Sequence, residues 1–572
     1  MRKLRFAILG AALVMVLAQA SPGAAVTTPV NIRVTNDAGG SYVSADQLAG
    51  GTYTDATLAR CSIDRRQQNE PTLAIDPRNA MVRTSGSNDY CTIPTNHDAW
   101  AGFYRSTDGG ATWVDSLLPG YLHDSSSQGS ASPVHQMALG GAIAAGDPVQ
   151  AWDGKGDVFF MGNNFNRGIE DGPSASFRDN TGDVWVATYA PSNPSDKSTD
   201  GSRYVRTVIL ASNTFGQGSF NDKTGIQVDQ ATGNVYAAWS DFHGRGCNEI
   251  LFSRSTDGGA TFSAPMKIST ICNNQGPNIA IGPGGQVYVS WNANTGGTFS
   301  LGSNFVRGAA FASSSDFGAS FSKDSIVVPF HRFTSGAFSG TGSRDCGDGP
   351  FACSSGQTFP RFDLAQPTIA TDNTAGKAAI YMAFQAVLAS GQGQTQFVKS
   401  TDGGASWSPA AAVDSQSIGH QFFPWITASA GRLSVVYYDS RADGSNYSAT
   451  KAPCNSDTGV GSACLGVWYS SSTDGGATWS HQELTSALTN PNLEQFGGRR
   501  VPFFGDYIMV SAVGGSIAAA WTDQRNAQPG LGTDGNDAAG DPAAGGACTS
   551  SFSTCFDGTG GLDQNIYTAN VS

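Results

Sequence analysis

STDGGATW occupies Ser106–Trp113 and recurs at Ser472–Trp479 in a chain of 572 residues. Three near-copies have the same plan: STDGGATF at Ser255–Phe262, SSDFGASF at Ser314–Phe321 and STDGGASW at Ser400–Trp407. An Asp side chain accepts hydrogen bonds from turn N–H groups and Gly permits positive φ, so each copy predicts a tight turn. The final Trp or Phe offers a large apolar face, which we expect to pack between neighbouring units. Five copies do not suit one active site, so we interpret the motif aspartates as structural: Asp108, Asp257, Asp316, Asp402 and Asp474.

The sequence around each motif follows a second pattern. A short apolar strand, a Gly/Asn/Asp turn and a strand that ends in an aromatic recur upstream, as in GIQVDQATGNVYAAWSD from Gly225 and PNIAIGPGGQVYVSWN from Pro277. Seven such units can be identified, each interpreted as strand A, turn, strand B, loop, strand C, Asp motif, strand D. Four antiparallel strands repeated at this length predict an all-β chain folded as a β-propeller, with seven blades favoured and six as the alternative.

The seventh unit stops at its strand C, QNIYTANVS, and lacks a fourth strand. TPVNIRVTN, residues 28–36, is a strand candidate without a partner near the N-terminus. We expect this segment to complete the last blade and close the ring, which would also remove exposed sheet edges.

The N-terminus and the cysteines predict export. MRKLRFAILGAALVMVLAQASPGAA combines a basic start, a short apolar run and a small-residue exit, so residues 1–25 are interpreted as a secretory signal and residues 26–572 as one propeller domain. A membrane anchor is the weaker alternative because the apolar run is short. Ten cysteines suit an oxidising compartment, and we expect five local disulfides, since the cysteines fall into neighbouring pairs: Cys61/Cys91, Cys247/Cys272, Cys346/Cys353, Cys454/Cys464 and Cys548/Cys555.

The composition excludes several classes of partner. Charged residues make up 14% of the chain and the net charge is −13, so no basic surface is predicted for nucleic acid or an anionic membrane. No zinc-binding or P-loop motif is present. We expect a monomer with no membrane span once the signal is removed.

The topology of a blade predicts which face carries chemistry. The Asp motifs join strands C and D, so they share one face with the A–B turns, whereas the B–C loops and the D-to-A connections lie on the other. The distinctive polar residues all map to that second face. They are the acids at the start of strand A with a neighbouring tyrosine, and the arginines that follow an Asp at the end of strand B: Glu70, Asp147, Asp222, Asp506, Tyr507, Arg441 and Arg525.

These residue types allow two functional interpretations and one structural interpretation. Clustered carboxylates serve acid/base catalysis with split pKa values or bind a hard cation such as Ca²⁺. Guanidinium groups bind a substrate carboxylate through two hydrogen bonds. In the structural alternative, the Asp-x-Arg pairs stabilise loops and the acids at strand starts cap turns.

The five Ser-x-Asp-x-Gly-x-x-Trp/Phe motifs resemble the Asp-box (BNR) repeats of the sialidase superfamily, and the resemblance covers the chain from about Asn69 to the C-terminus. It implies a propeller of secreted or lysosomal exo-sialidase type. The site it implies has three arginines for the substrate carboxylate, a Tyr nucleophile with a Glu partner, and an Asp acid/base. The family motif that carries the first arginine matches at Pro71, but Asn69 stands at the arginine position; Arg500 lies in a looser match, RRVPFFGDY.

We therefore predict a secreted, sialidase-like glycoside hydrolase that acts on the terminal residues of a glycan or glycoconjugate. Tyr507 would be the nucleophile, Glu70 its partner and Asp147 the acid/base. The predicted substrate-binding residues are Arg441, Arg525, Arg500, Asp506 and Asp222. No cofactor is expected to be required, and Ca²⁺ is a candidate ligand. The alternatives are a non-catalytic propeller that binds extracellular glycans or proteins, and a structural surface protein.

Overall fold

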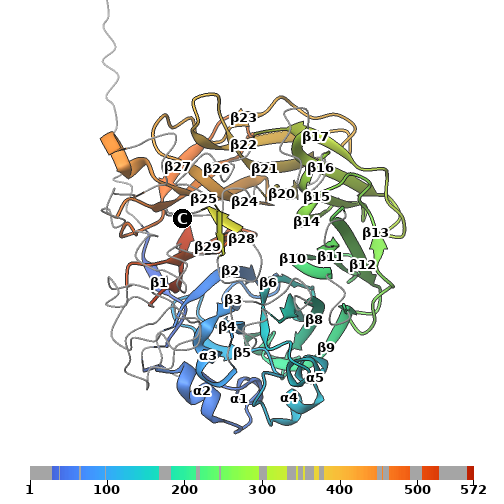
Figure 1. Ribbon diagram of the computed structural model, residues 1–572, viewed down its shortest axis with the longest axis vertical. Helices are drawn as coiled ribbons and strands as arrows, with labels where there is room; N and C mark the ends of the chain where they lie inside the picture. The colour runs from blue at the N-terminus through green and yellow to red at the C-terminus, as the bar shows by residue number, and fades with distance from the viewer. Residues whose placement is uncertain are drawn as a thin grey trace, which may run out of the picture.

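The protein was analysed as a computed structural model (Figure 1). The structure describes residues 29–571 with the following gaps: 38, 41, 64–65, 97, 167–181, 214–218, 244–246, 296–305, 332–342, 346–351, 355–365, 373–378, 447–453, 455–462, 490–504 and 527–562. The predicted signal segment, residues 1–25, lies outside the described residues. No helix in the described part of the chain is long and apolar enough to cross a membrane.

The described strands form seven four-stranded antiparallel sheets arranged as the blades of a ring. The A strands are β2 (Gln68–Ile75), β6 (Ala144–Trp152), β10 (Ser219–Val228), β14 (Gln275–Ile281), β20 (Thr368–Asp372), β24 (Gln421–Ser429) and β28 (Met509–Val513). The B strands are β3 (Arg83–Asp89), β7 (Val158–Phe165), β11 (Val235–His243), β15 (Val287–Asn294), β21 (Ala379–Val387), β25 (Arg432–Asp439) and β29 (Ser516–Asp523). The C strands are β4 (Trp100–Ser106), β8 (Gly182–Ala190), β12 (Glu249–Ser255), β16 (Arg307–Ser314), β22 (Gly393–Ser400), β26 (Gly466–Ser472) and β30 (Asn565–Val571). The D strands are β5 (Val114–Leu117), β9 (Arg203–Ala211), β13 (Met266–Lys267), β17 (Ser325–Pro329), β23 (Ala411–Ala412), β27 (Ser480–Glu483) and β1 (Asn31–Arg33).

The A strands surround the centre of the ring and the D strands lie at its rim (Figure 1). Blades are numbered 1 to 7 in chain order, from the sheet of β2 to the sheet of β28. The ring closes in blade 7, where β1 pairs antiparallel with β30 and brings Ile32 opposite Thr568. The prediction of a propeller closed by an N-terminal strand is confirmed, and the number of blades is seven.

The five repeated turns have one hydrogen-bond pattern. In the first, Asp108 Oδ1 accepts from the Ser106 hydroxyl at 2.8 Å and from the Thr112 amide at 2.9 Å. Asp108 Oδ2 accepts from the Thr112 hydroxyl at 2.6 Å, and Ser106 Oγ accepts from the Gly110 amide at 2.9 Å. The other four copies repeat the Ser–Asp bond at 2.7–2.8 Å. Each motif is therefore a self-contained turn between strands C and D.

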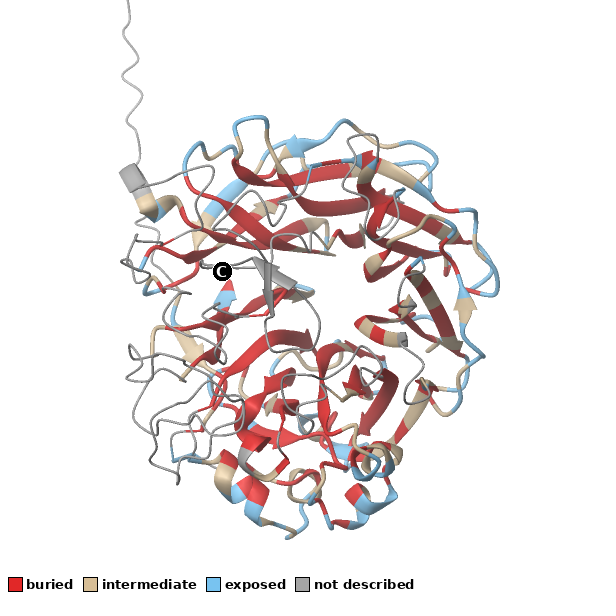
Figure 2. Ribbon diagram, in the orientation of Figure 1, coloured by how far each residue is buried: buried red, intermediate tan, exposed pale blue. Residues whose placement is uncertain are grey.

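The motif aromatics pack against the preceding blade. Phe321 meets Phe252 with ring centroids 4.7 Å apart, and Trp407 meets Phe311 at 5.3 Å. Trp479 repeats the arrangement against Phe397 at 5.3 Å. The expectation that these side chains pack between blades is confirmed. Each of the three is partly buried against the hydrophobic core between its two blades, in a ring whose strands are mostly buried (Figure 2).

Short helices and one extra hairpin lie outside the blades. The α-helices are α1 (Ala45–Leu48), α2 (Ala56–Cys61), α3 (Ile93–Asn96), α4 (Ser127–Ala131) and α5 (Pro133–Leu139), all beside blades 1 and 2 (Figure 1). The 3₁₀ segments used below are η1 (Tyr90–Thr92) and η4 (Arg441–Asn446), and the hairpin pairs β18 (Ser343–Asp345) with β19 (Ala352–Ser354).

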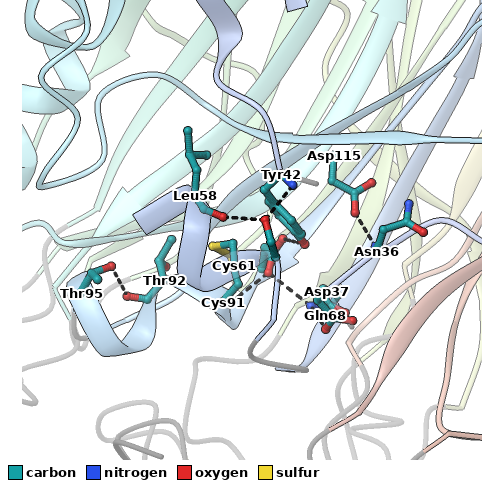
Figure 3. Close-up of a disulfide and its surroundings, with 12 residues drawn as sticks. Asn36, Asp37, Tyr42, Leu58, Cys61, Gln68, Cys91, Thr92, Thr95 and Asp115 are labelled. Atoms are coloured by element: carbon teal, nitrogen blue, oxygen red, sulfur yellow. Dashed lines mark hydrogen bonds between the residues drawn. A yellow bond between two sulfur atoms is a disulfide. The ribbon is translucent and has the colours of Figure 1, made fainter. Parts of the chain in front are cut away.

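Three of the five predicted disulfides fall in the described residues, and all three are formed. Cys61–Cys91 joins α2 to η1 (Figure 3), and the other two are Cys247–Cys272 and Cys454–Cys464. Cys346, Cys548 and Cys555 lie outside the described residues, and the side chain of Cys353 is not described. The three bridges lie in B–C loops and D-to-A connections, the face predicted for them.

Candidate functional site

The start of strand A is distorted in the same way in six blades. The backbone φ is positive at Glu70 (56°), Asp147 (50°), Lys223 (48°) and Phe423 (52°), and at the glycines of blades 4 and 7, Gly276 and Gly505. In blades 1, 2, 3, 4 and 6 the pairing register shifts at this point, as in a β-bulge. Bulges turn a side chain to a new direction, and positive φ at non-Gly residues is found mainly at functional sites.

Hydrogen bonds from the preceding blade hold several of these bulges. The Asp147 amide donates to Asn88 Oδ1 at 2.8 Å, and the Phe423 amide donates to Gln385 Oε1 at 2.9 Å. Because Asn88 and Gln385 belong to strand B of the preceding blade, each bulge is positioned by its neighbour in the ring. The side chains that leave the bulges therefore have fixed directions.

Three of these side chains, together with the adjacent Asp222 and Asp506, meet and form the lysine–carboxylate cluster, defined as Glu70, Asp147, Asp222, Lys223 and Asp506. Lys223 Nζ lies 2.8 Å from Asp147 Oδ1, 2.8 Å from Asp506 Oδ2 and 3.4 Å from Glu70 Oε1. Glu70, Asp147, Lys223 and Asp506 are buried, with at most 8% of each residue exposed. Four acids predicted to share a face are thus brought together from blades 1, 2, 3 and 7.

The cluster separates the protonation states of its acids. Burial raises the pKa of Glu70 well above its usual value, and the neighbouring Asp147 charge adds to the effect. Burial also acts to raise the pKa of Asp147, but Lys223 and hydrogen bonds from Glu70 and Asp222 hold that pKa well below its usual value. Burial raises the pKa of Asp222 to about 8. The surroundings therefore favour the protonated form of Glu70 and the ionised form of the adjacent Asp147.

Tyr507 lies next to the cluster. Its ring centroid is 6.0 Å from Lys223 Nζ, and its hydroxyl donates to the Pro148 carbonyl at 3.0 Å. Burial raises the pKa of Tyr507 well above its usual value, and Glu70 contributes in the same direction. The phenol is therefore neutral and hydrogen-bonded to the backbone of blade 2.

Arg441 and Arg525 lie away from the cluster, in the outer half of blades 6 and 7. Arg441 pairs with Asp414 at 2.5 Å and Asp439 at 2.6 Å, and its guanidinium carbon is 3.5 Å from the centroid of Trp468.

Arg525 repeats this arrangement. It pairs with Asp523 at 2.7 Å and lies 4.3 Å from the centroid of Tyr567. Both arginines thus extend from the end of strand B over strand C of the same blade, as the structural interpretation of the Asp-x-Arg pairs describes.

Of the two remaining positions from the family resemblance, only Asn69 lies in the described residues, and it carries no charge. Asn69 is buried and its amide donates to Gln564 Oε1 at 3.1 Å, while Asn88 donates to Asn69 Oδ1 at 3.0 Å. Arg500 lies outside the described residues. Within the described part of the chain, Lys223 is the cation that contacts the predicted acids.

A cavity of about 500 Å³ runs along the A strands and is lined by all seven blades. Its walls are mixed, with apolar side chains such as Leu73 and Met509 beside polar ones such as Gln150, Gln227 and Asp229. Trp425 lines the cavity and lies 6.2 Å from the ring of Tyr507. The five cluster residues precede these lining segments in the chain, and none of the five lines the cavity.

The described residues offer little for a metal ion. Among them, three potential ligand side chains converge at Asp443, Cys454 and Cys464, but the two cysteines form a disulfide and supply no thiolate. At the cluster, the Lys223 ammonium occupies the position between the carboxylates. A divalent cation in the cluster would have to displace it.

Lys223 is the functional candidate that the sequence analysis did not select. Its signal was present, because NDK at 221–223 occupies the same place before strand A as NE at 69–70 and GD at 146–147. The predicted site took the acids of this series and did not include its lysine. In the structure, Lys223 is the counter-ion of the acids at the start of the A strands, Glu70, Asp147 and Asp506.

No protein-family model matches the chain, and no curated protein matches it. Similar solved structures include a Hadza microbial sialidase, at 11% identity over 78% of this chain and 72% of that chain, with a TM-score of 0.39. A Trypanosoma rangeli sialidase in complex with the inhibitor DANA is 14% identical over 72% of this chain and 58% of that chain, with a TM-score of 0.39. A Penicillium chrysogenum α-L-arabinanase complexed with arabinobiose is 12% identical over 80% of this chain and 100% of that chain, again with a TM-score of 0.39. At these identities, the similarity is one of overall fold.

Proposed function

We propose that this chain is a secreted glycoside hydrolase acting on terminal glycan residues, with Glu70 as proton donor and Asp147 as its ionised partner. The observation that carries the proposal is the contact of both carboxyl groups with the one Lys223 ammonium, in surroundings that shift the pKa of Glu70 upward and that of Asp147 downward. Glycosidases pair a protonated carboxylic acid with a carboxylate for this chemistry.

Each group has a defined role in the proposed reaction. Glu70 gives its proton to the leaving glycosidic oxygen, and Asp147 either attacks the anomeric carbon or activates a water molecule. In the sialidase form, which the sequence resemblance favours, Tyr507 attacks instead. Glu70 must then be a carboxylate that takes the phenol proton, and Asp147 must carry the proton that goes to the leaving oxygen, which is opposite to the directions of their pKa shifts. That form requires the Tyr507 hydroxyl to leave the Pro148 carbonyl, so the carboxylate pair is the better supported arrangement.

The test is turnover of fluorogenic glycosides by the purified protein between pH 4 and pH 8, with a sialoside and neutral sugars such as an arabinoside. E70Q and D147N should each reduce kcat by about 100-fold or more, the usual loss of general acid–base catalysis. D257N is the matched control, because it makes the same change in a repeated turn on the opposite face. Equal activity of all three variants would contradict the assignment.

We also propose that the reaction needs no cofactor, because Lys223 already supplies the positive charge between the carboxylates. Dialysis against EDTA should leave kcat unchanged, with addition of Ca²⁺ as the control. Loss of activity that Ca²⁺ restores would show that a metal ion is required.

A non-catalytic propeller that binds extracellular glycans or proteins is the second candidate. It is favoured by the Tyr507 hydroxyl bound to backbone and by Arg441 and Arg525, both paired with aspartates. Saturable binding to a glycan array without turnover of any glycoside would support this function over hydrolysis.

A further inference from the structure

Lys223 joins three other blades at one point. It extends from blade 3 and its ammonium contacts Asp147 of blade 2, Glu70 of blade 1 and Asp506 of blade 7. A buried lysine normally loses its proton because burial disfavours the charge. Here burial acts to lower the pKa of Lys223, but the carboxylates around it raise that pKa well above its usual value.

The backbone fixes the direction of this lysine. Lys223 has a φ of 48°, and the pairing register breaks between Asp222 and Thr224. The Thr224 hydroxyl donates to the carbonyl of Asp147 at 2.6 Å, so the two bulges are held together. The ammonium therefore approaches the acids with little freedom to move elsewhere.

The seam between blades 7 and 1 brings the last acid close. A Cβ at Gly505 would lie 2.6 Å from the Glu70 amide nitrogen, which only glycine avoids. This close approach places Asp506 beside Glu70 in space, although the two are far apart in sequence. The cluster is thus a product of the closed ring and its glycine.

We infer that Lys223 is the positioning residue of the acid pair: it holds Asp147 as an oriented carboxylate beside Glu70 and takes the place that a metal ion would otherwise fill. The inference rests on the proposed function for its catalytic consequence. Its structural consequence, the contact of one ammonium with three acids of three other blades (Glu70, Asp147 and Asp506), stands independently of turnover.

The test compares K223M, which removes the charge at similar volume, with K223R, which keeps it. In K223M the pKa of Asp147 should rise, so kcat should fall at least 10-fold at pH 4–5 and recover partly toward pH 7. In K223R the profile should stay close to that of the wild type. A K223M profile with the wild-type shape would overturn the inference.

Thermal unfolding provides a readout that needs no substrate. Without the ammonium, the folded acids bind protons more tightly than the unfolded chain does, so the stability of K223M should fall as pH rises from 4 to 8. The wild type keeps the ammonium, so its stability should not show this additional decrease between pH 4 and pH 8. If the stability of K223M and that of the wild type change equally with pH, the inference is contradicted. Absence of turnover by the wild type would contradict only the proposed function.

A second variant covers the case in which K223M does not fold. K223M/D506N removes one positive and one negative charge together, and should fold because the charge balance is restored. It should still show the low-pH loss of turnover, since Asp147 again lacks its cation. A wild-type profile in this double variant would also overturn the inference.

Discussion

In four of the five repeated turns, the second glycine has no room for a side chain. A Cβ at Gly404 would lie 2.3 Å from the ring of Phe311, and one at Gly476 would lie 2.4 Å from Phe397. The aromatic residue belongs to strand C of the preceding blade in both cases. The motif glycine is therefore required by contact between blades as well as by its positive φ.

Alanine substitution of the adjacent Gly403 and Gly404 distinguishes the effect of positive φ from the effect of contact between blades. Gly404→Ala should lower the free energy of unfolding by about 3–4 kcal/mol, because it combines backbone strain with overpacking against Phe311. Gly403→Ala, at a φ of 73° with nothing within 4 Å of the added Cβ, should cost about 1–2 kcal/mol from strain alone. Urea unfolding of both variants measures the difference. Equal losses would show that contact between blades contributes nothing.

For individual residues, the sequence alone predicts the face on which a side chain lies but not which side chains it contacts. Glu70, Asp147, Asp222 and Asp506 could be assigned to one face, because the face follows from strand order. Their contact with Lys223 could not be predicted, since it depends on bulges whose positive φ falls on non-glycine residues. Side-chain direction at such positions is decided by the neighbouring blade, which no local pattern encodes.

The segment between β1 and β2 fastens the N-terminus to blade 1 (Figure 3). The Tyr42 hydroxyl donates to Asp89 at 2.7 Å, and the amide of Asn36 donates to Asp115. Gln68 donates to Asp37 at 3.1 Å. Asp37, Asp89 and Asp115 are completely buried, so this segment places three acids in a region of low polarity.

This arrangement predicts a stability that depends on pH. Burial raises the pKa of Asp37 to about 7, while Arg33 acts to lower it and Asp563, Gln68 and Asp89 also face it. The folded state therefore holds a proton that the unfolded chain has released, and stability falls as pH rises from about 4 to 7. Burial shifts the pKa values of Asp89 and Asp115 in the same direction.

Asp37→Asn removes one of these titrations while keeping the shape of the side chain. The decrease in the free energy of unfolding between pH 4 and pH 7 should become smaller by a few kcal/mol at most. Chemical denaturation at four or five pH values measures the slope, and Asp257→Asn in an exposed turn is the control. An unchanged slope would contradict burial as the cause.

The strands could be predicted because the repeat supplies seven similar examples of the same pattern. The helices could not, since α1 to α5 contain four to seven residues each and are too short to show periodicity. Their caps are visible only with the structure in hand: Ser44 and Gln47 form a capping box, and Asp55 caps α2. Short helices of this kind are stabilised by tertiary packing more than by their own sequence.

The strand that completes the last blade is short. β1 contributes three residues to blade 7, and Asn31 adds side-chain bonds to the Leu484 carbonyl at 2.7 Å and from Arg525 at 2.9 Å. Without β1, the outer edge of β30 would be unpaired and open to other strands. The pairing of β1 with β30 therefore contributes to the stability of the whole propeller. It also supports the lysine–carboxylate cluster, which needs blades 1 and 7 in contact.

Removal of residues 26–36 from the mature chain tests this connection. The truncated protein should melt about 5–10 °C lower and form oligomers through β30, because the last blade lacks its fourth strand. A synthetic peptide of residues 28–36, added in excess, should raise the melting temperature again by binding the folded edge. The same peptide with Ile32→Pro is the control, since proline cannot donate to a β-ladder. Equal melting of truncated and complete protein, or equal rescue by both peptides, would mean that pairing of β1 with β30 does not hold the ring closed.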